Sequence, residues 1–409
     1  MIRVLHIVPT LYGGGGEQVA IHILRNMDRS RFEPMAISFF DRVGAEGERL
    51  LENDGINVSY LGKRLGPDVR MVWRIHETLK RREPDVVHTH LRCLRYALPA
   101  LVASRGSLTA VHTVHNLAQR EVIRGDQLLY RFAFRRLGVT PVAIADAVHK
   151  SIQEVYQVSA PLIRNGVPVS QYQGTYEMRL KWREQHQIAP DEIVFVNVAR
   201  LSPQKNQRLL LNAFARVASR HRPLRCLLVG SGPLESELRQ QAEALSLQNK
   251  VRFLGQREDI REILAASDVG VLSSDWEGNP LSVMEIMASG KPMVGTAVGG
   301  VPELVLPGTG FLVSAGDVVA FADAMEQLVC DPDQRARMGA AGAELAQRHF
   351  SVSTMTRQYE SLYEAQLRLR VSSSGTAPSM VETGGLIEGR NALLVRLKRH
   401  RSIGNNPTR

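Results

Sequence analysis

The strongest constraint on the fold is an alternation of short apolar runs with amphipathic, helix-forming segments along the chain. Apolar runs at residues 3–9, 34–40, 84–90 and 108–116 are separated by segments of helical periodicity, and the rhythm resumes at residues 193–200. Strands joined in this way by helices form a parallel sheet with helices on both faces. We therefore predict an α/β protein whose ligands lie at the carboxyl ends of the strands.

The length of the chain predicts two domains. Its 409 residues, of which 44% are hydrophobic and 22% charged, exceed what one ordinary core accommodates. We place the first domain at residues 1–170 and the second at residues 190–350, with a polar connection at residues 171–190. Residues 371–409 are expected to be a disordered basic tail, because their first part is low in hydrophobic residues.

The net charge of +10 is spread unevenly. Residues 1–170 carry 23 Lys/Arg against 16 Asp/Glu, whereas residues 171–370 carry 22 against 23. Because no known nucleic-acid module accompanies the basic half, we expect it to face an anionic membrane surface or a phosphate-bearing acceptor, and no nucleic acid.

The cysteines and the apolar runs indicate where the protein works. Cys93, Cys226 and Cys330 are far apart and lack ligand spacing, which favours a reducing compartment over disulfides or a zinc site. The opening apolar run is too short for a signal peptide, and no run approaches transmembrane length. We expect a cytoplasmic protein, or one held at the inner face of the cytoplasmic membrane.

Residues 273–303 contain two glutamates, Glu277 and Glu285, with seven residues between them. Glu277 lies on a Gly/Asn/Pro loop after an apolar run, and Glu285 lies in a predicted helix at residues 281–289. A carboxylate accepts two hydrogen bonds from a vicinal diol, and a helix N-terminus favours phosphate or hydroxyl oxygens. The pair is suited to polyol binding, although solvated surface glutamates would give the same spacing.

The sequence EGNPLSVMEIMASGKPMVGT, followed by GGVPELV, resembles the donor-binding signature of the retaining family 4 glycosyltransferases. The similarity runs from about Ile2 to about Leu367. It implies the GT-B fold, in which two Rossmann-like domains face each other across a cleft. It also implies transfer of a sugar from a nucleotide-sugar without a metal or cofactor, and a final helix at residues 353–370 that packs back on the first domain.

The resemblance assigns roles to residues of the second domain. Arg200 closes a strand and Lys205 precedes a helix, so they would neutralise the departing diphosphate, although each alone could be a surface charge. Glu285 would hold the ribose, and Glu277 would hold the transferred sugar. The remaining donor-binding predictions are Gly230, Gly232, Arg257, Gly278, Asn279, Pro280 and Leu281.

Three features of the first domain are further candidates. The glycine run that includes Gly14, Gly15 and Gly16 opens a helix, and the resemblance places it beside the diphosphate, although a flexible turn needs no function. His115 matches the family's histidine that contacts the donor sugar. His88 and His90 also lie at the end of a predicted strand, and His90 would lie near the acceptor. We expect no metal there, because no third ligand is available at a matching position in the sequence. Histidines at such positions are often structural.

Two segments bear on membrane contact, and one on metal binding. Residues 120–136 mix arginine with aromatic and aliphatic residues, as in a helix that lies on an anionic membrane, although the apolar residues could equally be core. Residues 391–401 are basic and amphipathic, and could equally be a solvated tail. Asp331 and Asp333 form a D-x-D string, but they lie far from any predicted strand end, so we predict no metal role.

The predicted function is retaining, metal-independent transfer of a sugar, from a UDP-sugar, to a polysaccharide, lipid-linked or glycolipid acceptor. The predicted catalytic residues are His115, Glu277, Arg200 and Lys205. A nucleotide-sugar epimerase of the same fold and a non-catalytic sugar-binding protein are the alternatives. A nicotinamide dehydrogenase is disfavoured, because the sequence lacks G-x-G-x-x-G with its ribose-binding acid.

Overall fold

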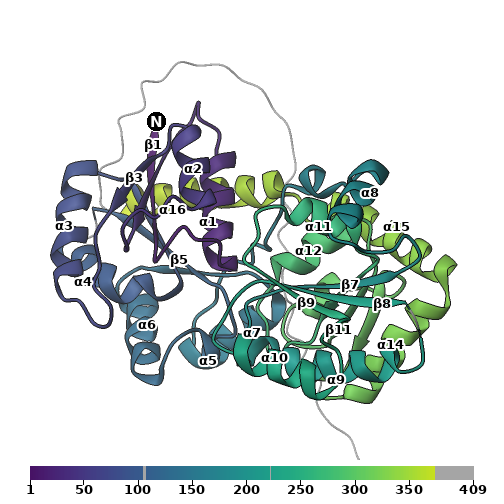
Figure 1. Ribbon diagram of the computed structural model, residues 1–409. Coiled ribbons are helices and arrows are strands. Elements are labelled where there is room, and N and C mark those ends of the chain that lie inside the picture. The colour runs from purple at the N-terminus through teal and green to yellow at the C-terminus, as the bar shows by residue number, and fades with distance from the viewer. Residues whose placement is uncertain (105–106, 222, 374–409) are drawn as a thin grey trace, which may run out of the picture.

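The computed structural model describes residues 1–104, 107–221 and 223–373, which form two parallel six-stranded sheets flanked by helices (Figure 1). The first sheet comprises β1 (Ile2–Val8), β2 (Phe32–Ser38), β3 (Asn57–Tyr60), β4 (Val86–His90), β5 (Thr109–Val114) and β6 (Thr140–Ala143). The second comprises β7 (Ile193–Val198), β8 (Leu224–Val229), β9 (Val251–Gly255), β10 (Val269–Leu272), β11 (Met293–Thr296) and β12 (Gly310–Val313).

Both sheets have the strand order of the doubly wound dinucleotide-binding fold. The first runs β3-β2-β1-β4-β5-β6 and the second β12-β11-β10-β7-β8-β9, which is the same order within its half. The order reverses between β1 and β4 and between β7 and β10. Loops leave these adjacent strands in opposite directions, so a crevice forms at the carboxyl edge of each sheet.

Helices cover both faces of each sheet, which explains the nearly continuous burial of the central strands. Around the first sheet lie α1 (Gly15–Asn26), α2 (Glu46–Asn53), α3 (Arg70–Arg82), α4 (Leu94–Ala103), α5 (Ala118–Glu121), α6 (Arg124–Arg136) and α7 (Asp146–Tyr156). Around the second lie α8 (Tyr176–Gln185), α9 (Gln207–Ala218), α10 (Glu235–Ala244), α11 (Ile260–Ala266), α12 (Leu281–Ala288), α13 (Val301–Leu304), α14 (Val318–Cys330) and α15 (Pro332–His349). Short 3-10 turns are η1 (Leu91–Cys93), η2 (Val169–Tyr172) and η3 (Pro203–Lys205).

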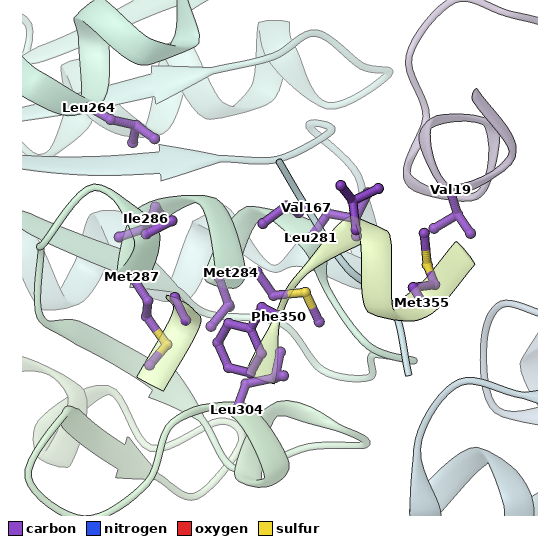
Figure 2. Close-up of a cluster of buried hydrophobic side chains, with 14 of the residues drawn as sticks. Val19, Val167, Leu264, Leu281, Met284, Ile286, Met287, Leu304, Phe350 and Met355 are labelled. Carbon is purple, nitrogen blue, oxygen red and sulfur yellow. The ribbon is translucent and has the colours of Figure 1, made fainter. Parts of the chain in front are cut away.

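Helix α16 (Val352–Ser373) returns from the second half to the first and packs against α1 and β5. It is the yellow-green helix that runs behind α1 in Figure 1. One hydrophobic cluster spans both halves along this path, from Val19 on α1 through Met355 on α16 to Met284 on α12 (Figure 2). Backbone hydrogen bonds from Val167 N to Phe350 O (2.8 Å) and from Val352 N to Val167 O (3.1 Å) tie the two crossover segments together.

The structure differs from the sequence predictions in several places. Strand β12 was not predicted, because its sequence GFLV is short and begins with glycine. The segment at residues 120–136 is two helices, with Tyr130 and Phe134 buried in the core. Helix α16 ends three residues later than predicted, and the predicted disordered tail and amphipathic end lie outside the described residues from 374 onward.

Candidate active site

The crevice at the second sheet brings Lys205 and Glu277 together from loops 72 residues apart. Lys205 follows β7, and Glu277 follows β10. Lys205 Nζ lies 2.6 Å from Glu277 Oε1, and the Ser274 hydroxyl donates to the same oxygen at 2.6 Å. The side chain of Glu277 is only 5% exposed and that of Lys205 18%, so a ligand would meet this pair as a preorganised, desolvated charge pair.

Glycine allows the Glu277 loop to approach its neighbours closely. A Cβ on Gly278 would lie 2.2 Å from the His115 carbonyl oxygen, and one on Gly299 would lie 1.8 Å from the Glu277 carbonyl oxygen. Gly299 also has φ +53°. Gly300 N donates to Gly278 O at 2.8 Å, so two glycine turns stack at the point where the halves meet. Any side chain at Gly278 would push His115 away from the Glu277 loop.

Asn279, the next residue, joins the second half to the crossover segment. The Asn165 N–H donates to Asn279 Oδ1 at 3.2 Å, and Asn165 Nδ2 donates to the Asn279 carbonyl at 2.8 Å. Asn279 Nδ2 is buried and has no partner among the described residues. Pro280 then caps α12, which begins at Leu281, so the predicted sugar-binding stretch is the entry to a helix.

Arg200 and the glycine run face each other across the cleft. Arg200 is exposed, and its charge acts on Glu17 in the first turn of α1. Burial raises the pKa of Glu17, while hydrogen bonds and the Arg200 charge lower it. A Cβ on Gly14 would meet the Glu17 carboxylate at 2.4 Å, and one on Gly16 would meet Leu91 at 2.9 Å and His115 at 3.2 Å; Gly15 is unobstructed. The glycines therefore allow α1 to begin directly against the histidine-bearing strand ends.

Glu285 lies one helical turn into α12 and is partly buried. The Tyr172 hydroxyl, from η2, donates to Glu285 Oε1 at 3.1 Å. Burial raises the pKa of Glu285 to about 7, although the Tyr172 hydrogen bond favours the charged form. The charge of this carboxyl is therefore poised to change near neutral pH.

His115 lies at the end of β5, on the side of the cleft opposite Lys205. Its Nε2 is 2.9 Å from His90 Nδ1, and burial lowers its pKa to about 3. His115 is therefore neutral throughout the physiological range, and it can act by hydrogen bonding but not as a cation. Burial also lowers the pKa of His90 well below its usual value.

A third histidine, His6 on β1, completes a cluster that the sequence prediction missed. One ring nitrogen of each of His6, His88 and His90 lies within 4.8 Å of the other two, so the prediction that no third ligand is available was wrong. All six ring nitrogens already have hydrogen-bond partners. Zinc bonds of about 2.0–2.1 Å would require the nitrogens to approach more closely and lose those partners.

The other predicted donor-site residues have evident structural tasks. Gly230 and Gly232 let the β8 loop pack on the β7 loop, since a Cβ on either would lie within 2.2 Å of a carbonyl oxygen. Arg257 pairs with Asp259 at 2.6 Å. Asp331 caps α15 by accepting from Gln334 N at 2.8 Å, with Asp333 in the first turn of that helix.

Polar contacts hold the two halves together on both sides of the cleft. Arg49 on α2 pairs with Glu258 at 2.8 Å, and Gln256 Nε2 donates to the Tyr12 carbonyl at 2.9 Å. On the other side, the Arg120 guanidinium lies 4.6 Å from the centre of the Trp276 ring. Loops from the two sheets therefore meet directly in front of the site.

Arg164 also bridges the halves. It pairs with Asp146 and with Glu303 of α13, and Glu303 Oε1 accepts from the Asp146 N–H at 2.8 Å. Glu303, like His6, Glu17 and Tyr172, was not predicted as part of the site. Among these residues, only Glu17 had a signal in the sequence, because it lies in the first turn of the helix that the glycine run opens.

The family models match both halves of the chain. Residues 13–171 match Glycosyltransferase Family 4, and residues 178–345 match Glycosyl transferases group 1. The chain is 30% identical over 305 residues to the D-inositol 3-phosphate glycosyltransferase of Corynebacterium efficiens, covering 69% of this chain and 71% of that enzyme. It is 28% identical over 310 residues to the N-acetyl-alpha-D-glucosaminyl L-malate synthase of Bacillus anthracis, covering 74% and 80%.

Solved structures share the fold across the whole described chain. Anabaena Alr3699/HepE in complex with UDP-glucose superposes with a TM-score of 0.79 at 24% identity, covering 89% of this chain and 100% of that one. Sucrose-phosphate synthase from Thermosynechococcus elongatus superposes with a TM-score of 0.77 at 18% identity, covering 90% and 100%. The chain therefore belongs to the family 4 glycosyltransferases and is an enzyme of the GT-B fold.

Proposed function

We propose that this glycosyltransferase moves a sugar from a UDP-sugar, with retention of configuration and without a metal, to an anionic acceptor held by the first half. The observation that carries the proposal is the Lys205–Glu277 pair at the crevice of the second sheet, which Arg200 adjoins at the end of β7. Such crevices are where doubly wound sheets bind nucleotides.

Charge distribution supports a reaction without a metal. The leaving diphosphate gains negative charge as the glycosidic bond breaks, and fixed cations in a site that excludes water stabilise that charge. Arg200 is exposed, and Lys205 is held in place by Glu277. These two side chains would do the work that Mg²⁺ does in other nucleotide-dependent transferases.

The contacts of Glu277 support attack of the acceptor on the same face of the sugar from which the leaving group departs. Its Oε1 already binds Lys205 and Ser274, which stabilise the negative charge of the carboxylate and weaken it as a covalent nucleophile. The departing phosphate oxygen would then take the proton from the acceptor hydroxyl. The proposal for UDP is supported by the UDP-glucose complex of the structurally similar Alr3699/HepE.

A basic, aromatic cavity in the first half supports an anionic acceptor. It has a volume of about 450 Å³ and opens at the carboxyl ends of the first four strands. Lys63, Arg92 and Arg95 line it beside Phe40 and Tyr96. Within the described chain only Arg95 of the three cations has a carboxylate partner, Asp126 at 3.1 Å, so the cavity keeps a positive balance.

The acceptors named for several relatives are anionic, which fits an anionic acceptor here. The names of these relatives include L-malate, D-inositol 3-phosphate and, for an Escherichia coli galactosyltransferase, a diphosphoundecaprenol carrier. A phosphate or carboxylate in this cavity would lie within reach of the cations and stack its sugar or polyol on the aromatic rings.

Contact with an anionic membrane remains part of the proposal. Helix α6 buries Tyr130 and Phe134 but leaves Leu128 70% and Phe132 54% exposed, with Arg131 and Arg135 on the same helix. Apolar and basic side chains exposed together suit a lipid interface. In residues 1–104, 107–221 and 223–373, no helix has both the length and the apolar character to span a membrane.

Nucleotide release separates this function from its alternatives. UDP-, GDP- and ADP-sugars would be incubated with the enzyme in EDTA, with and without phosphorylated, lipid-linked or dicarboxylate acceptors. We expect UDP release that requires an acceptor. Epimerised donor without nucleotide release would identify an epimerase, and donor binding without turnover would identify a sugar-binding protein. Replacing Lys63 or Arg95 by alanine should raise the acceptor KM and leave donor binding unchanged.

A further inference from the structure

We propose that a buried line of hydrogen bonds, which ends on helix α16, fixes the tautomer of His115. The Nδ1–H of His115 then points away from this line and is available as a donor. The residues that position the His115 proton in this way are His90, His6, Tyr363, His88, Thr113 and Tyr359. The inference about the proton stands on contacts among the first half and α16, whereas its catalytic consequence rests on the proposed function.

Strand geometry places these residues on one face. His88 and His90 are two residues apart on β4, so both point to the same side of the sheet, and His6 lies opposite His88 in the β1–β4 register. That side is the one covered by α16, which contributes Tyr359 and Tyr363. Bulk water does not reach the hydrogen bonds of the line, because its inner residues are all 0% exposed: His6, His88, His90, Thr113, Tyr359 and Tyr363.

Six hydrogen bonds link seven groups in a line. From the cleft inward, His115 Nε2 meets His90 Nδ1 at 2.9 Å, and His90 Nε2 meets His6 Nδ1 at 3.0 Å. His6 Nε2 meets the Tyr363 hydroxyl at 3.3 Å, and that hydroxyl meets His88 Nδ1 at 2.7 Å. His88 Nε2 meets Thr113 Oγ1 at 2.8 Å, and Thr113 Oγ1 meets the Tyr359 hydroxyl at 3.0 Å.

The number of protons decides the direction of the line. A neutral imidazole donates at one nitrogen and accepts at the other, and each hydroxyl donates once. Burial lowers the pKa of all four histidines, so none is charged. Seven groups thus bring seven protons to six bonds, and one proton must leave the line at an end.

The two ends are not equivalent. If the surplus proton were at Tyr359, its hydroxyl would need a second partner, and the described residues offer only Thr113. A buried donor without an acceptor disfavours that direction by about ten to one or more. At the other end, His115 Nδ1 has no partner within the described chain, and it is not among the buried polar atoms that lack one, so it is accessible to solvent. The surplus proton therefore belongs on His115 Nδ1.

The consequence is a neutral donor of fixed direction in the site. Every bond in the line must reverse before His115 can offer a lone pair at Nδ1, so the preference is all-or-none. An N–H at that position can donate to a hydroxyl of the transferred sugar. Because Tyr359 and Tyr363 belong to α16, the helix that returns from the second half also sets the proton of His115.

Two tyrosines on the same helix provide a matched experiment. Tyr363→Phe and Tyr359→Phe each remove one buried hydroxyl, but only Tyr363 lies inside the line. Tyr363→Phe cuts the line after His6, whereas in Tyr359→Phe the Thr113 hydroxyl still donates to His88 and the direction persists. The full-length protein would be labelled with ¹⁵N-histidine, and two-bond ¹H–¹⁵N correlations would identify the protonated ring nitrogen of His115, assigned with His115→Gln.

We expect His115 to be protonated at Nδ1 in the wild type and in Tyr359→Phe, and to be a mixture of tautomers in Tyr363→Phe. In that variant kcat should fall about twofold with donor KM unchanged, in proportion to the lost Nδ1–H population. Thr113→Val, which also cuts the line, and Thr113→Ser, which preserves it, repeat the comparison if Tyr363→Phe does not fold.

Three results would overturn the inference: protonation of His115 at Nε2 in the wild type, an unchanged pattern in Tyr363→Phe and Thr113→Val, or zinc found by elemental analysis in the purified enzyme. The spectra are recorded without substrate. They therefore test the proton assignment even if His115 proves to have no part in sugar transfer.

Discussion

The two halves share one strand order but carry opposite chemistry at equivalent places. At the crevice of the second sheet stand a lysine, an arginine and a carboxylate, with Lys205 and Glu277 already paired at 2.6 Å. At the crevice of the first sheet stand neutral imidazoles, whose pKa values burial has lowered. The second half therefore builds its site from charges, whereas the first half adds neutral donors of fixed direction beside its basic cavity.

This difference suggests a division of labour. A diphosphate needs fixed charge, which loops after β7 and β10 provide, whereas a sugar needs hydrogen bonds of defined direction. Because burial keeps these imidazoles neutral, they are not repelled by the cations of either half. The predictions below separate the two contributions.

Lys205→Ala should have the largest effect. Removing a fixed cation from the leaving group is expected to lower kcat/KM by about 10²–10³-fold. It also leaves the buried Glu277 carboxylate without its cation and with only the Ser274 hydroxyl, which should cost about 3 kcal/mol of folding free energy. Lys205→Ala/Glu277→Gln is the control, because it should recover stability by thermal unfolding without recovering activity. Activity restored in the double variant would show that the charge itself is not needed.

His115→Gln should have a smaller effect, of about 10- to 100-fold on kcat. A hydrogen bond to a charged or developing charge is worth about 1.5–3 kcal/mol, and glutamine retains only part of the geometry. UDP affinity should stay unchanged, since His115 lies on the neutral side. A large loss of UDP binding, measured by calorimetry, would show that His115 contacts the diphosphate. That result would contradict the division of roles between the halves.

Glu285 should make donor binding depend on pH. Its pKa is raised to about 7, so it is neutral below that pH and a carboxylate above it. Only the carboxylate can accept two hydrogen bonds from a ribose diol, so the donor KM should rise about three- to tenfold as pH falls through 7. Glu285→Gln should have a raised KM at pH 8 and no such pH dependence. A wild-type KM that stays flat from pH 6 to 8 would contradict the ribose role.

The Arg49–Glu258 contact should have the smallest effect. Its side chains are 46% and 61% exposed, and an exposed ion pair contributes at most about 1 kcal/mol. A double-mutant cycle with Arg49→Ala and Glu258→Ala should give a coupling below that value in stability, with kcat changed by less than about threefold. A larger coupling would show that this contact controls how the halves close.

The sequence predicted which strand ends would carry the candidate residues, but it did not predict which side chains would contact one another. The resemblance and the strand-end positions together predicted Lys205, Glu277 and His115 as site residues, since the carboxyl ends of parallel strands converge. The direct Lys205–Glu277 contact joins loops 72 residues apart and depends on strand order, which periodicity does not reveal. His6 looked like an ordinary core residue of β1, and only the register with β4 places it beside His88. Tyr172 and Tyr363 come from connections between the halves, whose packing no local pattern encodes.

The most direct test of the division between the halves is calorimetric titration with UDP and with uridine in EDTA. The account predicts that wild-type enzyme and His115→Gln bind UDP much more tightly than uridine, and that Lys205→Ala and Arg200→Ala lose most of that difference. Equal affinities of the wild type for UDP and uridine, or a preference for UDP that depends on His115 and not on the two cations, would contradict it.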